Sequence, residues 1–329
     1  MAPLALLVIV FMLLAGGNGV GDPATPATAP APDYILRDCA WTYKDTAWTA
    51  HLAIPGACYE FYKSRPHDRL DNYAQYALSD YDRDYLKGLI CNFRDAGAAK
   101  NYSETDDVLN ILAFVQSMPY APDKLSTGYD EYPRYPIEPL VDGGGDCEDT
   151  AILAAAILNE MGYGTVLIRL DGHMALGVKC TGDFPGAYYV YKGARYYYLD
   201  TTCKGLGIGQ EPAEYARSNA TILPMASEPC MYANFSFRVE DRGADFARCR
   251  VHCNVSNVGT GTAKNATLRI MGHGGAPGAY VPIGDVDEGA AGWVEATLAM
   301  PVNETTQIEC ALYGENFKPV EVKSGLFYL

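Results

Sequence analysis

The spacing of apolar residues along the chain changes character near residue 230. Between residues 34 and 142 the apolar positions mostly recur every three or four residues, which is typical of amphipathic helices. From about residue 231 apolar and polar residues alternate, as in 247–255, which indicates half-buried strands. The pattern predicts a mainly helical part followed by an all-β part, with the boundary near residue 228.

One strong helix and a small antiparallel sheet are predicted in the middle of the chain. Residues 148–161 carry apolar side chains at helical spacing, and Gly162 suits the position just past a helix end. The apolar segments that follow read as short strands at 165–170, 174–178, 188–191 and 196–199. Residues 123–139 are rich in proline, tyrosine and charge, which predicts a long loop that walls a substrate site.

The N-terminal segment indicates where the protein resides. Residues 4–14 are apolar, but this run is shorter than the roughly 20 residues that a membrane-spanning helix needs. Residues 1–21 fit either a cleaved signal peptide or a retained N-terminal anchor, and residues 22–33 form a Pro/Ala/Thr-rich linker. Under both readings we expect an extracellular or cell-surface protein, tethered to the membrane if the segment is retained.

Charge and cysteine content narrow the classes of partner. A net charge of −15 excludes nucleic-acid binding, which needs a basic surface. Ten cysteines fit an oxidising compartment, and we expect a disulfide between Cys310 and either Cys249 or Cys253, all on the apolar phase of strands. A metal site at Cys249-x-x-His252-Cys253 is not expected, because His252 faces away from both thiols on a strand. We expect no metal and no cofactor.

Three residues occur in the local settings that a thiol nucleophile requires. Cys147 follows Gly143-Gly144-Gly145-Asp146 at a predicted helix start, His173 follows a Gly, and Asp200 ends a strand. A thiol, an imidazole and a carboxylate in this order can generate a nucleophilic thiolate. The helix N-terminus and an imidazolium would favour that thiolate, whereas the neighbouring acidic residues oppose it. The backbone N–H of Cys147 could help to hold an oxyanion.

Each of these residues also has a structural interpretation. Cys147 could be one more disulfide partner, and Asp200 could cap the turn at Thr201 and Thr202. The glycine-rich helix entry, with His173 and Asp200 downstream, favours the catalytic interpretation.

At these residues the sequence resembles a known family. The blocks Gly-Asp-Cys147-Glu-Asp, Gly-His173-Met-Ala-Leu-Gly-Val and Tyr-Tyr-Leu-Asp200-Thr-Thr resemble the signature of the transglutaminase-like superfamily. Segments at 114–117, 132–136 and 206–209 resemble its exported prokaryotic branch. The resemblance implies a papain-type α+β fold, with Cys147 as nucleophile, His173 as general base and then acid, and Asp200 orienting the imidazole. It also implies a second oxyanion donor upstream, for which Gln116 and then Tyr120 are the candidates.

We therefore expect residues 34–228 to form an α+β papain/transglutaminase-like domain, in which the helix bearing Cys147 packs on an antiparallel sheet. Residues 229–329 are expected to form a β-sandwich that loosely resembles immunoglobulin-like domains. The expected function is an exported thiol acyl-transfer enzyme that attacks amide bonds of a protein or peptide substrate. Hydrolysis is favoured over cross-linking because water is the default acceptor. The alternative is a surface binding or adhesion protein on an inactive transglutaminase-like scaffold.

Overall fold

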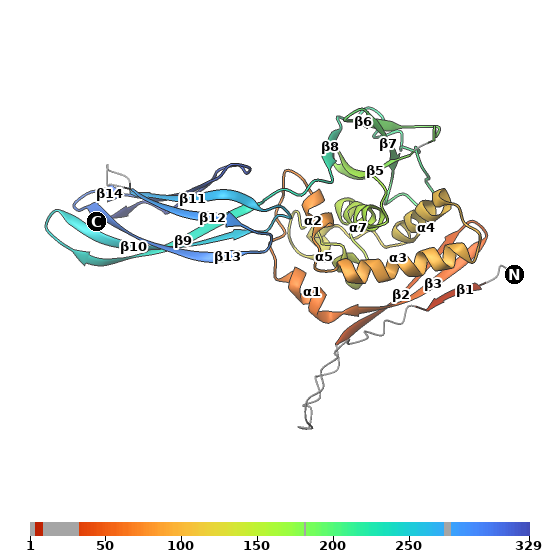
Figure 1. Ribbon diagram of the computed structural model, residues 1–329, viewed down its shortest axis with the longest axis horizontal. Helices are drawn as coiled ribbons and strands as arrows, with labels where there is room; N and C mark the ends of the chain where they lie inside the picture. The colour runs from red at the N-terminus through yellow and green to blue at the C-terminus, as the bar shows by residue number, and fades with distance from the viewer. Residues whose placement is uncertain (1–3, 9–32, 181, 273–277) are drawn as a thin grey trace, which may run out of the picture. The chain divides into compact units, whose positions relative to one another are not determined.

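A computed structural model describes residues 4–8, 33–180, 182–272 and 278–329 of the chain. The fold is mixed α/β, rich in strands, and contains several sheets (Figure 1). The chain divides into two compact units, Met1–Met225 and Ala226–Leu329. This division lies close to the boundary predicted near residue 228.

From residue 33 onward, the first unit starts with a β-hairpin and continues with six helices. The elements are β2 (Tyr34–Tyr43), β3 (Thr46–Pro55), α1 (Gly56–Lys63), α2 (Ala74–Leu78), α3 (Arg83–Ala98), α4 (Glu104–Gln116), α5 (Asp123–Ser126) and α6 (Ile137–Asp142). Ser103 caps α4 by accepting a hydrogen bond from the backbone N–H of Asp106, and the Asp106 carboxylate accepts one from the Ser103 N–H. The hairpin packs against α4, where the Trp41 indole donates to Asn110.

The expected long loop at 123–139 is not irregular throughout. Its start forms the single turn α5, and its end forms the beginning of α6. Ile137 and Leu140 of α6 are buried in the core, and Pro136 precedes the helix. The many prolines made this segment look irregular. Proline is tolerated at a helix start, however, and Pro122 and Pro136 lie directly before these two short helices.

The middle of the chain folds as the sequence predicts. α7 (Cys147–Glu160) packs on β5 and β4, and its other side contacts α2, α3 and α4 (Figure 1). The five-stranded antiparallel sheet has the order β6-β7-β5-β4-β8. Its strands are β4 (Thr165–Leu170), β5 (His173–Lys179), β6 (Tyr188–Tyr191), β7 (Ala194–Leu199) and β8 (Thr221–Pro224). The predicted helix and four of these strands are confirmed, whereas β8 was not expected.

The second unit consists, in its described residues, of strands. Its two larger sheets have the orders β13-β10-β9 and β12-β11-β15-β16, and β14 pairs with β17. The strands are β9 (Met231–Arg242), β10 (Phe246–Asn257), β11 (Ala263–Gly272), β12 (Ala279–Val286), β13 (Ala291–Pro301), β14 (Thr305–Thr306), β15 (Ile308–Tyr313), β16 (Val320–Lys323) and β17 (Phe327–Tyr328). Both larger sheets contribute side chains to one core, including Val251 of β10 and Leu268 of β11.

The three cysteines on the predicted strands of this second unit face its core as predicted. Cys249, Cys253 and Cys310 are fully buried, whereas His252 lies on the other face and pairs with Glu295 at 3.2 Å. All ten cysteines are free thiols in this structure, so the expected disulfide is not formed in it. The thiols of Cys253 and Cys310 perturb one another's pKa values, so of the two expected pairings we favour Cys253 with Cys310.

The N-terminal apolar run differs in one respect from the expectation that it lies outside the fold. Leu4–Val8 form β1, which pairs in parallel with β3. An extended apolar segment can add to the open edge of a sheet in this way. The rest of the run and linker residues 22–32 lie outside the described residues, so cleavage or anchoring stays a prediction. In the described part of the chain, the helices are too short or too polar to cross a membrane.

Candidate active site

The glycine run places Cys147 at the first residue of α7. Gly143 adopts a left-handed conformation (φ 74°) that ends α6. Gly145 lies directly against Asp149, and a Cβ added at Gly145 would come within 2.6 Å of that side chain. The backbone N–H of Asp146 donates to Asp149 Oδ2 at 3.1 Å, which fixes the first turn of the helix. The sequence Gly-Gly-Gly-Asp-Cys therefore forms the tight turn that connects α6 to α7.

His173 and Asp200 meet because their strands are neighbours. β5 pairs with β7, and Asp200 follows the last residue of β7. The distance from His173 Nε2 to Asp200 Oδ2 is 3.1 Å, and both side chains are buried. The structure thus brings together these two predicted site residues, which are 27 residues apart along the chain.

Asp200 contacts both His173 and the turn that follows it. Its Oδ2 faces His173 and also accepts from the Tyr198 hydroxyl at 2.9 Å. Its Oδ1 accepts from the backbone N–H groups of Thr202 and Cys203, so it also caps the turn. Burial raises the pKa of Asp200, but the hydrogen bonds from His173 and from the amides outweigh burial and hold that pKa well below its usual range. Asp200 is therefore ionised and fixed in place.

The thiol of Cys147 has an unexpected partner. Its Sγ donates a hydrogen bond to Glu148 Oε2 at 3.1 Å. Burial, followed by the charge and hydrogen bond of Glu148, raises the pKa of Cys147, while the backbone N–H of Met174 acts in the opposite direction. Of the opposing influences expected at this thiol, burial and Glu148 therefore outweigh the helix N-terminus.

The contact with Met174 places the thiol beside the strand that carries His173. Met174 follows His173 on β5, and α7 packs on that strand. Cys147 is partly buried at this junction. Because His173 uses Nε2 for Asp200, Nδ1 is the ring nitrogen left to exchange a proton with a substrate or a thiol.

Gln116, the first candidate for the second oxyanion donor, is used structurally. Its Nε2 donates to the carbonyl oxygens of Asp200 at 2.7 Å and Leu206 at 3.0 Å, and its Oε1 accepts from Gly205. Both amide protons are therefore occupied, so Gln116 is not available to an oxyanion here. It acts as a positioning residue that holds the segment after Asp200.

Tyr120, the second candidate, lies next to the thiol. Its backbone bridges to Gly145, two residues before Cys147, and its side chain is 60% exposed. Burial, together with the charges of Cys147 and Asp146, raises the pKa of its hydroxyl to about 12. The hydroxyl therefore stays protonated and can donate a hydrogen bond at neutral pH.

Tyr215 is a site residue that the sequence did not reveal. Its ring stacks on His173, with centroids 4.3 Å apart and an interplanar angle of 7°. Burial raises the pKa of Tyr215 most, followed by the charges of Glu214, Asp200 and Cys147. Tyr215 therefore lies near Cys147 and Asp200 as well as against His173. It lies in an irregular segment 42 residues after His173, where no pattern marks it.

A buried arginine holds the loop before the nucleophile. Arg134 is 1% exposed and binds the carboxylates of Asp123 and Asp149, and its backbone N–H donates to Asp149 at 2.7 Å. It thereby ties the loop at 123–136 to the first turn of α7. This role could not be predicted from the sequence, because a lone arginine in a charged loop is usually a solvated side chain.

The carboxyl groups of Asp123, Asp146 and Glu148 lie within 4.8 Å of one another and are the described side chains that could hold a metal ion. Burial, and then the charges of Glu148 and Asp123, raise the pKa of Asp146 to about 8. A shared proton can therefore satisfy this cluster as well as a cation can.

Comparisons with known proteins give weak similarities. No protein-family profile and no curated protein matches the chain. The transglutaminase of red sea bream is 11% identical with a TM-score of 0.29, over 85% of this chain and 66% of that one. The ApaA protein of Bordetella pertussis is 15% identical with a TM-score of 0.21, over 31% of this chain and 93% of that one. At such TM-scores these similarities are a distant suggestion and carry no argument for an activity.

Proposed function

We propose that the chain is a thiol acyl-transfer enzyme in which Cys147 is the nucleophile, His173 the proton carrier and Asp200 the orienting carboxylate. The observation that carries this proposal is the buried His173–Asp200 hydrogen bond beside the start of α7, where the Cys147 thiol contacts the N–H of Met174. An imidazole fixed by an ionised carboxylate, next to a thiol at a helix N-terminus, is the arrangement that thiol acyl transfer needs.

The reaction follows from these roles. His173 Nδ1 accepts the proton of the thiol, and the thiolate attacks the carbonyl carbon of an amide. The oxyanion that forms is held by the Cys147 N–H and the Tyr120 hydroxyl. The imidazolium returns its proton to the leaving amine, which departs and leaves a thioester on Cys147. A water molecule, deprotonated by His173, then attacks the thioester and releases a carboxylic acid; an amine in place of water gives transamidation.

We favour hydrolysis, because water is the default acceptor of a thioester. The substrate is a protein or peptide outside the cell, to which the N-terminal segment would deliver or tether the enzyme. The fold that accompanies this proposal is a transglutaminase-like catalytic unit followed by an immunoglobulin-like sandwich. Its support is the packing of α7 on an antiparallel sheet and the shared core of the two later sheets.

One observation favours a second function. The Cys147 thiol donates to Glu148, and burial with this carboxylate raises its pKa, which suits an inert thiol on a binding scaffold. The two functions differ in whether His173 controls the thiol.

Alkylation of Cys147 by iodoacetamide, followed against pH by peptide mass spectrometry, separates the two functions. For an enzyme, His173→Ala slows alkylation far more near pH 6 than near pH 9, because the imidazolium no longer stabilises the thiolate. His51→Ala is the matched control, since His51 also pairs with an aspartate, Asp38, at 2.6 Å on the distant hairpin. An unchanged profile in His173→Ala removes the catalytic proposal and favours the binding protein.

A further inference from the structure

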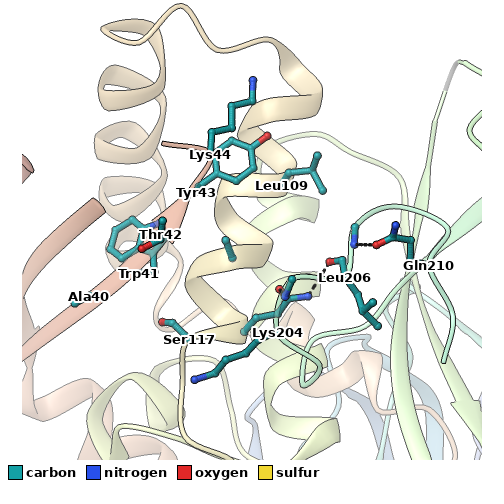
Figure 2. A pocket seen from close by; sticks show the side chains of 14 residues that line it. Ala40, Trp41, Thr42, Tyr43, Lys44, Leu109, Ser117, Lys204, Leu206 and Gln210 are labelled. Atoms are coloured by element: carbon teal, nitrogen blue, oxygen red, sulfur yellow. Dashed lines mark hydrogen bonds between the residues drawn. The ribbon is translucent and has the colours of Figure 1, made fainter. Parts of the chain in front are cut away.

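A cavity lies between β2, α4 and the segment that follows Asp200. Its volume is about 600 Å³, within the range of ligand pockets. Figure 2 shows its three walls, formed by residues 40–44, by one side of α4 and by residues 204–210. Cys147, His173 and Asp200 do not line it. The cavity is therefore additional to the catalytic centre proposed above.

One wall of this cavity is the free edge of a sheet. β2 is an outer strand of the sheet β1-β3-β2 and, in the described residues, pairs with β3 alone. The hairpin turns through Lys44 and Asp45, so its closing pair is Tyr43 with Thr46. Because hydrogen-bonded and non-hydrogen-bonded pairs alternate from there, the N–H and C=O groups of Ala40 and Thr42 point away from β3. Such an edge is a template for an extended chain.

The facing wall carries a positive charge without a partner carboxylate. Lys204 is exposed, and no carboxylate of the described residues lies within 4.0 Å of its ammonium group. Lys44, at the other end of the cavity in Figure 2, is paired with Asp106 at 2.7 Å. In a chain with a net charge of −15, an unpaired ammonium facing a cavity favours an acidic ligand.

We propose that this cavity is a docking groove for an extended acidic peptide. The peptide adds to β2 as a further strand, using the outward groups of Ala40 and Thr42, and places a carboxylate against Lys204. Its alternate side chains pack on the apolar part of the groove, which includes Leu109 and Leu206. Four extended residues span roughly 13 Å, a length suited to a groove of this size.

The groove shares a wall with the support of the catalytic centre. Gln116 joins the carbonyl oxygens of Asp200 and Leu206, so a docked peptide contacts the segment that holds Asp200. Binding of the peptide itself needs no chemistry at Cys147, so it can be measured whether or not the proposed function holds.

The test uses the full chain and a fluorescein-labelled peptide of alternating valine and glutamate, six residues long, followed by fluorescence anisotropy. We expect saturable binding that is equal in wild type and Cys147→Ala. Lys204→Gln should weaken binding by up to about fivefold, the effect of one exposed ion pair. Thr42→Pro should weaken it at least about tenfold, because proline removes the outward N–H without breaking the ladder to β3.

Matched controls lie outside the groove. Leu36→Pro places proline at another outward-facing position of β2, and Lys179→Gln removes an exposed lysine of β5; both should bind as wild type does. A peptide N-methylated at alternate residues should lose binding to the unaltered protein, which tests strand addition even if Thr42→Pro fails to fold. If the N-methylated peptide, or a valine–lysine peptide, bound as tightly as the unmodified valine–glutamate peptide, the proposal would be overturned.

Discussion

Replacing Glu148 by glutamine removes the carboxylate that accepts the hydrogen bond of the Cys147 thiol. The two side chains are 3.1 Å apart, and Glu148 is buried. A negative charge at this distance disfavours the thiolate, so its removal should lower the pKa of Cys147. The perturbation is nearly isosteric and leaves His173 and Asp200 untouched.

The size of the effect follows from the distance. Two unit charges 3.1 Å apart repel by about 1.3 kcal/mol at the dielectric constant of water and by about 5 kcal/mol at an effective value of 20. These limits correspond to roughly 1 to 4 pH units in the pKa of Cys147. The pKa of Glu148 is itself raised, by burial first. A charge this close typically shifts a pKa by roughly 1–3 units, so the lower half of this range applies.

The rate changes less than the thiolate population does. Each unit by which the pKa falls raises the thiolate fraction about tenfold, but it also makes the thiolate a weaker nucleophile by about threefold. For a fall of roughly one to two units, iodoacetamide should alkylate Cys147 of Glu148→Gln about threefold to tenfold faster at pH 7.

The assay is the alkylation rate of Cys147 from pH 5 to pH 10, read by peptide mass spectrometry. Glu160→Gln is the control, because Glu160 is the last residue of the same helix and lies far from the thiol. An alkylation rate at pH 7 that is unchanged or lower in Glu148→Gln would refute the electrostatic account of the resting thiol.

Three further outcomes are expected. Burial raises the pKa of Asp82 to about 7, so the stability that the protonated carboxyl contributes is present below pH 4 and is lost as pH rises through 7. Asp82→Asn should therefore raise the unfolding free energy by up to about 4 kcal/mol at pH 8 and by much less at pH 5. Melting temperatures at the two pH values check this. Gln116→Ala leaves three backbone groups unpaired and should lower unfolding free energy by roughly 2–4 kcal/mol in urea titrations, with loss of turnover. Under oxidising conditions Cys253 and Cys310 should form a disulfide worth roughly 4 kcal/mol, and non-reducing peptide maps that link Cys249 instead would contradict this.

Local patterns were sufficient to predict the frame of the candidate site. The glycine run, the helical spacing after Cys147 and the short strands around His173 are all signals that a few neighbouring residues carry. Because β5 and β7 are neighbours in the sheet, the pairing of His173 with Asp200 follows from strand order. These features depend on backbone propensity and periodicity, which sequence expresses directly.

Side-chain direction and long-range burial could not be predicted. Gln116 reads as an available donor at a helix end, but its amide turns to carbonyl groups about 90 residues away. Arg134 is buried only because carboxylates from α5 and α7 surround it, and Tyr215 reaches His173 from an irregular segment. The hydrogen bond from the Cys147 thiol to Glu148 likewise depends on the rotamers and burial of the two side chains, which sequence does not express.

Trapping of an acyl-enzyme tests the central claim most directly. The purified full-length protein is incubated with an aryl acetate. At early times, before the thioester is hydrolysed, the acetylated peptides are mapped by mass spectrometry. The account predicts one acetyl group on Cys147, formed more slowly in Asp200→Asn and absent from Cys147→Ala, while the exposed thiol of Cys91 stays unlabelled. Acetylation of Cys91 as fast as Cys147, or label at Cys147 that is unaffected by loss of His173, would contradict it.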